Sequence, residues 1–93
     1  MSITADNVTY LYNENSILIY PNPNNGCFTL SLSNINNLMN SINIYDLSGK
    51  FIFSEKLNKN TMEIHLKNVE EGIYTAKIIF AQGIVYKKIL VVN

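Results

Sequence analysis

The chain has no arginine and no tryptophan, and its 93 residues include one histidine, one cysteine and two prolines. Seven lysines balance seven acidic side chains, so the formal net charge is zero. Arginine is the preferred residue for bidentate contacts with phosphates and guanine edges, so its absence argues against a nucleic-acid binder. Lys50, Lys77, Lys87 and Lys88 fall in the strand-rich part of the chain, where we interpret them as solvated strand charges.

Long hydrophobic runs and a leader pattern are also missing. No apolar stretch approaches the roughly 18 residues of a membrane span. The first residues, Met-Ser-Ile-Thr-Ala-Asp-Asn, lack a basic segment followed by an apolar one, so they do not match a signal peptide. The single cysteine, Cys27, has no partner for an internal disulfide. The fold therefore does not depend on an oxidising compartment, and cysteine usage does not place the protein inside or outside the cell.

The residues that hydrolytic or transfer chemistry needs are scarce. Such chemistry requires a positioned nucleophile and base, or a metal ion. His65 lies between Ile64 and Leu66, on the polar side of an alternating stretch, so we expect it to face solvent. There is no second histidine for a relay, no ligand pair at zinc spacing and no phosphate-binding glycine loop. We therefore predict a domain that is not an enzyme and that binds no metal or cofactor.

Strict alternation of apolar and polar side chains recurs along the chain, and this period of two is typical of half-buried β-strands. The residues expected to point inward are Phe28, Leu30 and Leu32, then Ile42 and Ile44, then Met62, Ile64 and Leu66. The predicted strands are 17–20, 27–32, 41–45, 51–57, 61–66, 73–80 and 84–92. Residues 33–40 carry several asparagines and predict a loop rather than a helix.

Seven short strands at regular spacing, with no helix of useful length, predict an all-β protein. A chain of about 100 residues suits a seven-stranded immunoglobulin-like antiparallel β-sandwich, although the Cys–Trp–Cys core of true immunoglobulin domains is missing. Tyr74, near the start of the sixth strand, is placed for a tyrosine corner. We expect residues 1–16 to be a linker or N-terminal arm, in which Val8–Tyr12 could add a short edge strand, and residues 17–93 to form the domain.

Two turns have distinctive chemistry. Pro21 and Pro23 fix the backbone φ angle and lack an N–H group, so the segment between the first two strands is stiff and unsuited to a central strand. Asp46-Leu47-Ser48-Gly49-Lys50 fits a hairpin loop in which Gly49 has positive φ. The three consecutive apolar residues that follow, 51–53, leave the buried face of that strand open.

The last strand carries Lys87 beside Lys88, which point to opposite faces. At most one of them can face the core. Both sides of this strand are largely apolar, so either both are covered or one faces a partner. We predict an edge strand with an unpaired backbone row, which suits strand addition by another protein.

Four motifs occur in a characteristic order. They are Ile-Tyr-Pro-Asn-Pro-x-x-Gly, Ile-Tyr-Asp-Leu-Ser-Gly-Lys, Glu-Glu-Gly-Ile-Tyr-Thr-Ala-Lys-Ile and a closing Lys-Lys-Ile-Leu-Val-Val. Together they resemble the type A C-terminal sorting domain of the bacterial type IX secretion system, over residues 17–93. The resemblance implies a seven-stranded immunoglobulin-like tail of a larger secreted protein, so the chain is expected to be a fragment of that precursor.

The resemblance also implies recognition residues, partners and a location. The family motifs contain Pro21, Asn22, Pro23, Gly26, Gly49, Lys50, Gly72, Tyr74, Lys87 and Lys88. The implied partners are the type IX translocon, a sortase-like surface peptidase that removes the tail, and the upstream cargo domain. The implied route runs through the periplasm to the cell surface or the medium.

Two other functions remain open on the residues alone. A carbohydrate- or surface-binding β-sandwich would stack sugars on exposed aromatics. It would require the tyrosines to gather in one concave patch, whereas scattered tyrosines favour the sorting role. The third alternative is a weak homodimer formed through an edge strand.

Overall fold

The computed structural model describes residues 17–33, 40–80 and 83–93, and these form seven β-strands. The strands are β1 (Ile17–Tyr20), β2 (Cys27–Leu32), β3 (Asn40–Asp46), β4 (Phe51–Leu57), β5 (Thr61–His65), β6 (Gly72–Phe80) and β7 (Gly83–Val91). Each lies where the alternation predicted it, with ends shifted by no more than one residue. The expected strand at Val8–Tyr12 and most of the loop at 33–40 lie outside the described residues.

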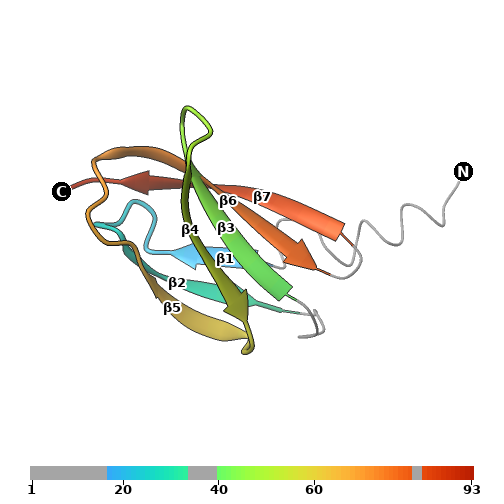
Figure 1. The fold of residues 1–93 in the computed structure, drawn as a ribbon. Coiled ribbons are helices and arrows are strands. Elements are labelled where there is room, and N and C mark those ends of the chain that lie inside the picture. Colours follow the sequence, from blue (N-terminus) through green and yellow to red (C-terminus); the bar gives the residue numbers. More distant parts are fainter. Residues whose placement is uncertain (1–16, 34–39, 81–82) are drawn as a thin grey trace, which may run out of the picture.

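The strands form two antiparallel sheets that pack as two layers (Figure 1). One sheet has the order β1-β2-β5 and the other the order β4-β3-β6-β7. The predicted antiparallel sandwich is therefore confirmed. β1 and β7 are each the last strand of their sheet, and the chain between β1 and β2 bridges from one to the other. None of the described residues belongs to a helix that could cross a membrane.

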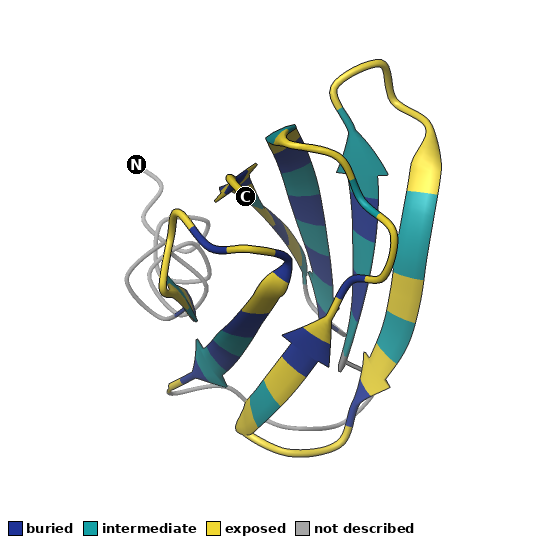
Figure 2. Ribbon diagram, turned by 90° about the vertical axis from the view of Figure 1, so that its left-hand side faces the viewer, coloured by how far each residue is buried: buried dark blue, intermediate teal, exposed yellow. Residues whose placement is uncertain are grey.

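The core lies between the two sheets, and alternate residues of β2, β3 and β6 are buried in it (Figure 2). The inward set predicted from the alternation is confirmed on β2, β3 and β5, and Leu66 just after β5 is buried as well. β6 and β7 add Tyr74, Ala76, Ile78 and Phe80, and then Val85, Ile89 and Val91. Apolar burial at these positions is the main force holding the two layers together.

The open question at residues 51–53 is answered by an irregularity in the β3–β4 pairing. Ile44 pairs with Phe53, whereas the next residue, Tyr45, pairs with Phe51. The register shift leaves one extra residue, Ile52, on β4. As a result Phe53 and Ile52 are half-buried against the core, while Phe51 is exposed and makes an edge-to-face contact with Tyr45 at 6.0 Å between ring centroids. Strict alternation could not predict this arrangement.

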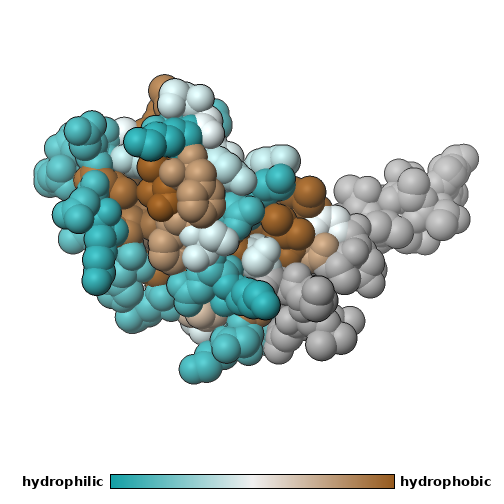
Figure 3. All heavy atoms as spheres, in the orientation of Figure 1, coloured by the Kyte–Doolittle hydropathy of each residue, from teal (hydrophilic) through white to brown (hydrophobic). Residues whose placement is uncertain are grey.

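The outer face of the four-stranded sheet is not fully polar. Among its exposed apolar side chains are Ile73 on β6 and Ile84, Tyr86 and Leu90 on β7. Space-filling Figure 3 shows hydrophobic residues interrupting the hydrophilic surface on one side of the molecule. The apolar character of both sides of β7 thus has two causes, because one side belongs to the core and the other is exposed.

Candidate recognition surface

The proline segment, residues 21–26, crosses from the three-stranded sheet to the outer edge of β7. The peptide bonds that precede Pro21 and Pro23 are both cis. Asn22 Nδ2 donates to the Lys88 carbonyl at 2.9 Å, and Asn22 Oδ1 accepts from the Leu90 N–H at 2.9 Å. A single side chain therefore pairs with the edge of β7 in the way that a neighbouring strand's backbone would.

Asn24 continues this pairing with its backbone. Its N–H donates to the Leu90 carbonyl at 3.0 Å, and its carbonyl accepts from the Val92 N–H at 2.7 Å, which forms a short parallel bridge. Its side chain is buried, with 5% exposure. There Nδ2 donates to the Pro21 carbonyl at 2.9 Å and Oδ1 accepts from the Gly26 N–H at 2.8 Å. The sequence indicates only a turn residue at position 24, and nothing in its local pattern reveals this role of Asn24.

Gly26 closes the corner. It has φ +105°, and a Cβ atom there would lie 3.2 Å from the Leu66 carbonyl oxygen. The Gly26 carbonyl accepts from the Leu66 N–H at 2.8 Å, so the backbone is held at that short distance. Glycine is therefore required here both by backbone conformation and by close approach. We call residues 21–26 together with Lys88–Val92 the corner seam.

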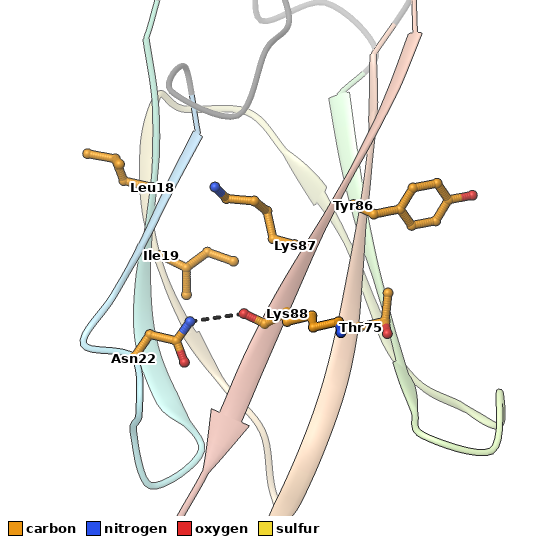
Figure 4. Close-up of a pocket in the computed structure, with 7 residues that line it drawn as sticks. All are labelled: Leu18, Ile19, Asn22, Thr75, Tyr86, Lys87 and Lys88. Carbon is orange, nitrogen blue, oxygen red and sulfur yellow. Dashed lines mark hydrogen bonds between the residues drawn. The ribbon is translucent and has the colours of Figure 1, made fainter.

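The two lysines of β7 face opposite sides, as predicted. Lys87 shares the side of Val85 and Ile89 and is half-buried. Lys88 is exposed on the outer face with Tyr86. Figure 4 shows Lys87 directed toward Ile19 of β1 and Lys88 directed toward Thr75 of β6.

A groove of about 540 Å³ lies between the edges of the two sheets, next to the corner seam (Figure 4). The lining combines apolar and charged groups from β1, β6, β7 and the corner: Leu18, Ile19, Asn22, Thr75, Tyr86, Lys87 and Lys88. The predicted recognition residues Asn22, Lys87 and Lys88 therefore share one depression. The sequence alone did not bring them together, because 65 or more positions separate Asn22 from the two lysines.

The expected unpaired backbone row on β7 is only partly present, and this corrects the prediction. β7 is an edge strand, but Asn22 and Asn24 occupy its outward carbonyl and N–H groups from Lys88 to Val92. Outward groups alternate along an antiparallel strand, so those of Ile84 and Tyr86 point the same way. Among the described residues, therefore, only the first half of the β7 edge, at Ile84 and Tyr86, has outward backbone groups that another strand could pair with.

The second family motif forms the predicted hairpin. Asp46 Oδ1 accepts from the Ser48 N–H at 2.9 Å, the Ser48 hydroxyl at 2.7 Å and the Lys50 N–H at 2.9 Å. The hydrogen bond from the Ser48 side chain is the main cause that lowers the pKa of Asp46, with the Lys50 backbone N–H next. Gly49 has φ +92°, as expected. Both Gly49 and Lys50 are exposed, so a partner can reach this loop.

Replacing Gly49 with valine is expected to cost about 1–3 kcal/mol in the free energy of unfolding, because a β-branched residue is strained at positive φ. Nothing lies within 4 Å of the position of its Cβ atom, so the effect would be conformational and not steric. Chemical denaturation measures it, and Gly49→Asn is the control, since asparagine tolerates this conformation. Equal stability of the valine and glycine forms would contradict the assigned turn.

The third motif surrounds a tyrosine corner, as predicted. Tyr74 is buried, and its hydroxyl donates to the Glu70 carbonyl at 2.6 Å. Asp46 pairs with Tyr74, and Gly72 pairs with Val91 of the corner seam. The corner, the Gly49 hairpin and the start of β6 therefore lie toward the same end of the strands; in Figure 1 the corner and the start of β6 are on the left and the hairpin projects at the top. Lys87 and Lys88 lie nearer the middle of β7, before its end at the corner.

The described tyrosines do not gather in one patch. Tyr45 and Tyr86 lie on the outer face of the four-stranded sheet, but β6 separates their strands. Tyr20 is exposed on the other sheet, and Tyr74 is buried. Tyr10 and Tyr12 are outside the described residues. This scatter disfavours the sugar-binding alternative and favours the sorting alternative.

The geometry defines a class of protein: a small all-β sandwich whose edge strand is capped by a proline corner and whose turn motifs cluster at one end. Residues 18–92 match the family described as the secretion system C-terminal sorting domain, and the chain belongs to that family of type IX sorting domains. The resemblance inferred from the four motifs is therefore confirmed. The domain is a sorting tail and is not itself catalytic.

Two relatives are ulvan lyases. The chain is 35% identical over 86 residues to an endo-acting ulvan lyase of Formosa agariphila, and the matched segment covers 86% of this chain and 16% of that protein. It is 32% identical over 79 residues to an ulvan lyase of Nonlabens ulvanivorans, and the matched segment covers 84% of this chain and 14% of that protein. The chain thus corresponds to about one sixth of the length of these relatives.

Solved structures share the fold. One is PorZ, described as an essential bacterial surface component of the type IX secretion system of Porphyromonas gingivalis, with TM-score 0.71 and 14% identity over 85% of this chain and 12% of that chain. Another is a DUF3244 family protein of Bacteroides vulgatus with an immunoglobulin-like β-sandwich fold, with TM-score 0.68 and 15% identity over 85% of this chain and 87% of that chain. The predicted immunoglobulin-like fold is confirmed.

Proposed function

We propose that this domain is the C-terminal tail of a longer precursor and that it directs an upstream cargo across the outer membrane through the type IX translocon. Family membership supports the sorting role. The lyases that contain a similar segment are several times longer than the chain, which fits a tail on a larger protein. The cargo passes through the periplasm and ends at the cell surface or in the medium.

We further propose that the translocon recognises this domain by binding to the corner seam and the adjoining groove. The observation that carries this proposal is the convergence of Asn22 with Lys87 and Lys88 in one depression. The side chains of Pro21, Asn22 and Pro23 are exposed, so a partner can contact them, even though Asn22 also bonds to β7. The outward backbone groups of Ile84 and Tyr86, which no other described residue pairs with, offer main-chain hydrogen bonds, and the lysine charge offers specificity for an acidic surface.

In this proposal the cargo is released in a separate step, by cleavage of the chain. A sortase-like surface peptidase cuts in or before residues 1–16, upstream of the folded sandwich. The hydrogen bonds of the corner keep the chain after β1 attached to β7, so the peptidase would meet a folded sandwich.

The proposal predicts that the domain is sufficient for export. A signal peptide, a folded reporter and residues 1–93 joined in that order should place most of the reporter at the surface or in the medium of a type IX-competent bacterium. Cell fractionation and protease accessibility of the reporter measure this. The same fusion in a strain without the translocon, and the reporter without residues 1–93, should stay in the periplasm.

Retention of the intact fusion in the periplasm of the competent strain would contradict the proposal, provided that the domain is folded there. Resistance of the sandwich to limited proteolysis establishes folding in the same fractions.

A further inference from the structure

Outside the corner seam, the structure brings together the only cysteine and the only histidine of the chain. Cys27 and His65 are direct partners in the β2–β5 register, and both side chains are exposed on the outer face of the three-stranded sheet. His65 Nδ1 lies 3.2 Å from Cys27 Sγ. On the other side of the ring, Nε2 lies 3.4 Å from Glu63 Oε1. The predicted exposure of His65 is confirmed, whereas its pairing with Cys27 was not predicted from the sequence.

The backbone holds the pair in place. The neighbouring residues Phe28 and Ile64 are also register partners, and both are buried in the core. Just beyond the pair, the Leu66 N–H donates to the Gly26 carbonyl at 2.8 Å. A slip of one residue would turn the core residues outward, so the register that opposes Cys27 and His65 is strongly specified.

The spacing of the two ligand atoms suits a zinc ion. Zinc binds cysteine sulfur at about 2.3 Å and histidine nitrogen at about 2.0–2.1 Å, so two such ligands at a tetrahedral angle lie about 3.5 Å apart. The observed separation of 3.2 Å needs little adjustment. The contact between Nε2 and Glu63 favours the tautomer that carries its proton on Nε2, and in that tautomer the Nδ1 lone pair faces the sulfur. Carboxylates commonly orient metal-binding histidines in this way.

We propose that Cys27 and His65 form half of a zinc site and that a second copy of the chain supplies the other half. Structural zinc takes four ligands, and the described part of the chain contains no group of three or more potential ligands that would hold a metal alone. A two-fold axis through the ion brings in the identical pair, which completes a Cys₂His₂ set. The two thiolates balance the charge of the ion, and each chain has zero formal net charge, so overall repulsion does not oppose the approach.

Cobalt(II) is a suitable probe because a tetrahedral site with sulfur ligands gives a strong characteristic absorption. Titration of reduced chain 1–93 with Co²⁺ should reach its end point at one ion per two chains. Sedimentation should change from monomer to dimer over the same range, and Zn²⁺ should displace the cobalt. Cys27→Ser and His65→Ala should each abolish both signals, while Glu63→Gln should weaken metal affinity about 10–100-fold. Glu55→Gln, on the other sheet, is the matched control and should behave as the parent chain.

Absence of binding at micromolar metal would overturn the proposal. Binding that survives in Cys27→Ser or His65→Ala would assign the ion to another place on the chain and would equally overturn it. An end point of one ion per chain without a dimer would exclude the shared site. Thermal melting of each variant checks that it is folded; Cys27, Glu63 and His65 are exposed, so the fold should persist when they are replaced.

Discussion

Replacing Asn24 with alanine is expected to lower the free energy of unfolding by about 2–4 kcal/mol, because a buried group that loses its hydrogen-bond partner costs about 1–3 kcal/mol. The variant would leave the Gly26 N–H and the Pro21 carbonyl without their side-chain partner. The total stability of such a domain is about 5–15 kcal/mol, so the loss is a large fraction of it. Urea denaturation at an unchanged slope would measure the effect.

The neighbouring asparagines provide matched controls. Asn25 is exposed, and its Oδ1 accepts from the Cys27 N–H at 3.2 Å, so Asn25→Ala should cost less than about 1 kcal/mol. Asn22 is also exposed, and water can replace its bonds to β7, so Asn22→Ala should fall between the two. Equal stability of the Asn24 and Asn25 variants would show that the buried amide is not what holds the corner.

The strands were predictable from the sequence because their signal is local. Alternation from Cys27 to Leu32 and from Thr61 to Leu66 directly marks the inward side chains, and the core side of each strand follows from it. The face of β4 was not predictable, because the extra residue Ile52 depends on how β3 and β4 pair. Turn chemistry was sufficient to place Gly49 at positive φ.

The candidate site was predictable only as a set of motif residues. The hydrogen bonds of Asn22 join positions that are 66 and 68 residues apart, and nothing in the local pattern indicates them. The same is true of Cys27 and His65, which meet only because β2 and β5 pair in a particular register. The burial of Asn24 likewise follows from the crossing of the corner onto β7.

A charge reversal on β7 should separate recognition from folding. Replacing Lys87 and Lys88 together with glutamate is expected to abolish export of the reporter fusion while the domain stays folded. Lys88 is exposed, where a charge change moves stability by about 0.5 kcal/mol or less, and Lys87 is half-buried beside an open groove. Reversed charges at a docking surface penalise the encounter with the partner itself.

Lys56 and Lys59 give a control with the same change in net charge. Both are exposed near the far end of β4, away from the corner seam, so their replacement with glutamate should leave export intact. The single variants are also informative, because Lys87 lies on the same side of β7 as the buried residues Val85 and Ile89. Lys88→Glu should block export with no loss of thermal stability. Any loss of stability in the double variant should come from Lys87→Glu. If the folded double variant is still exported, the translocon does not recognise these lysines, and the proline corner becomes the next surface to alter.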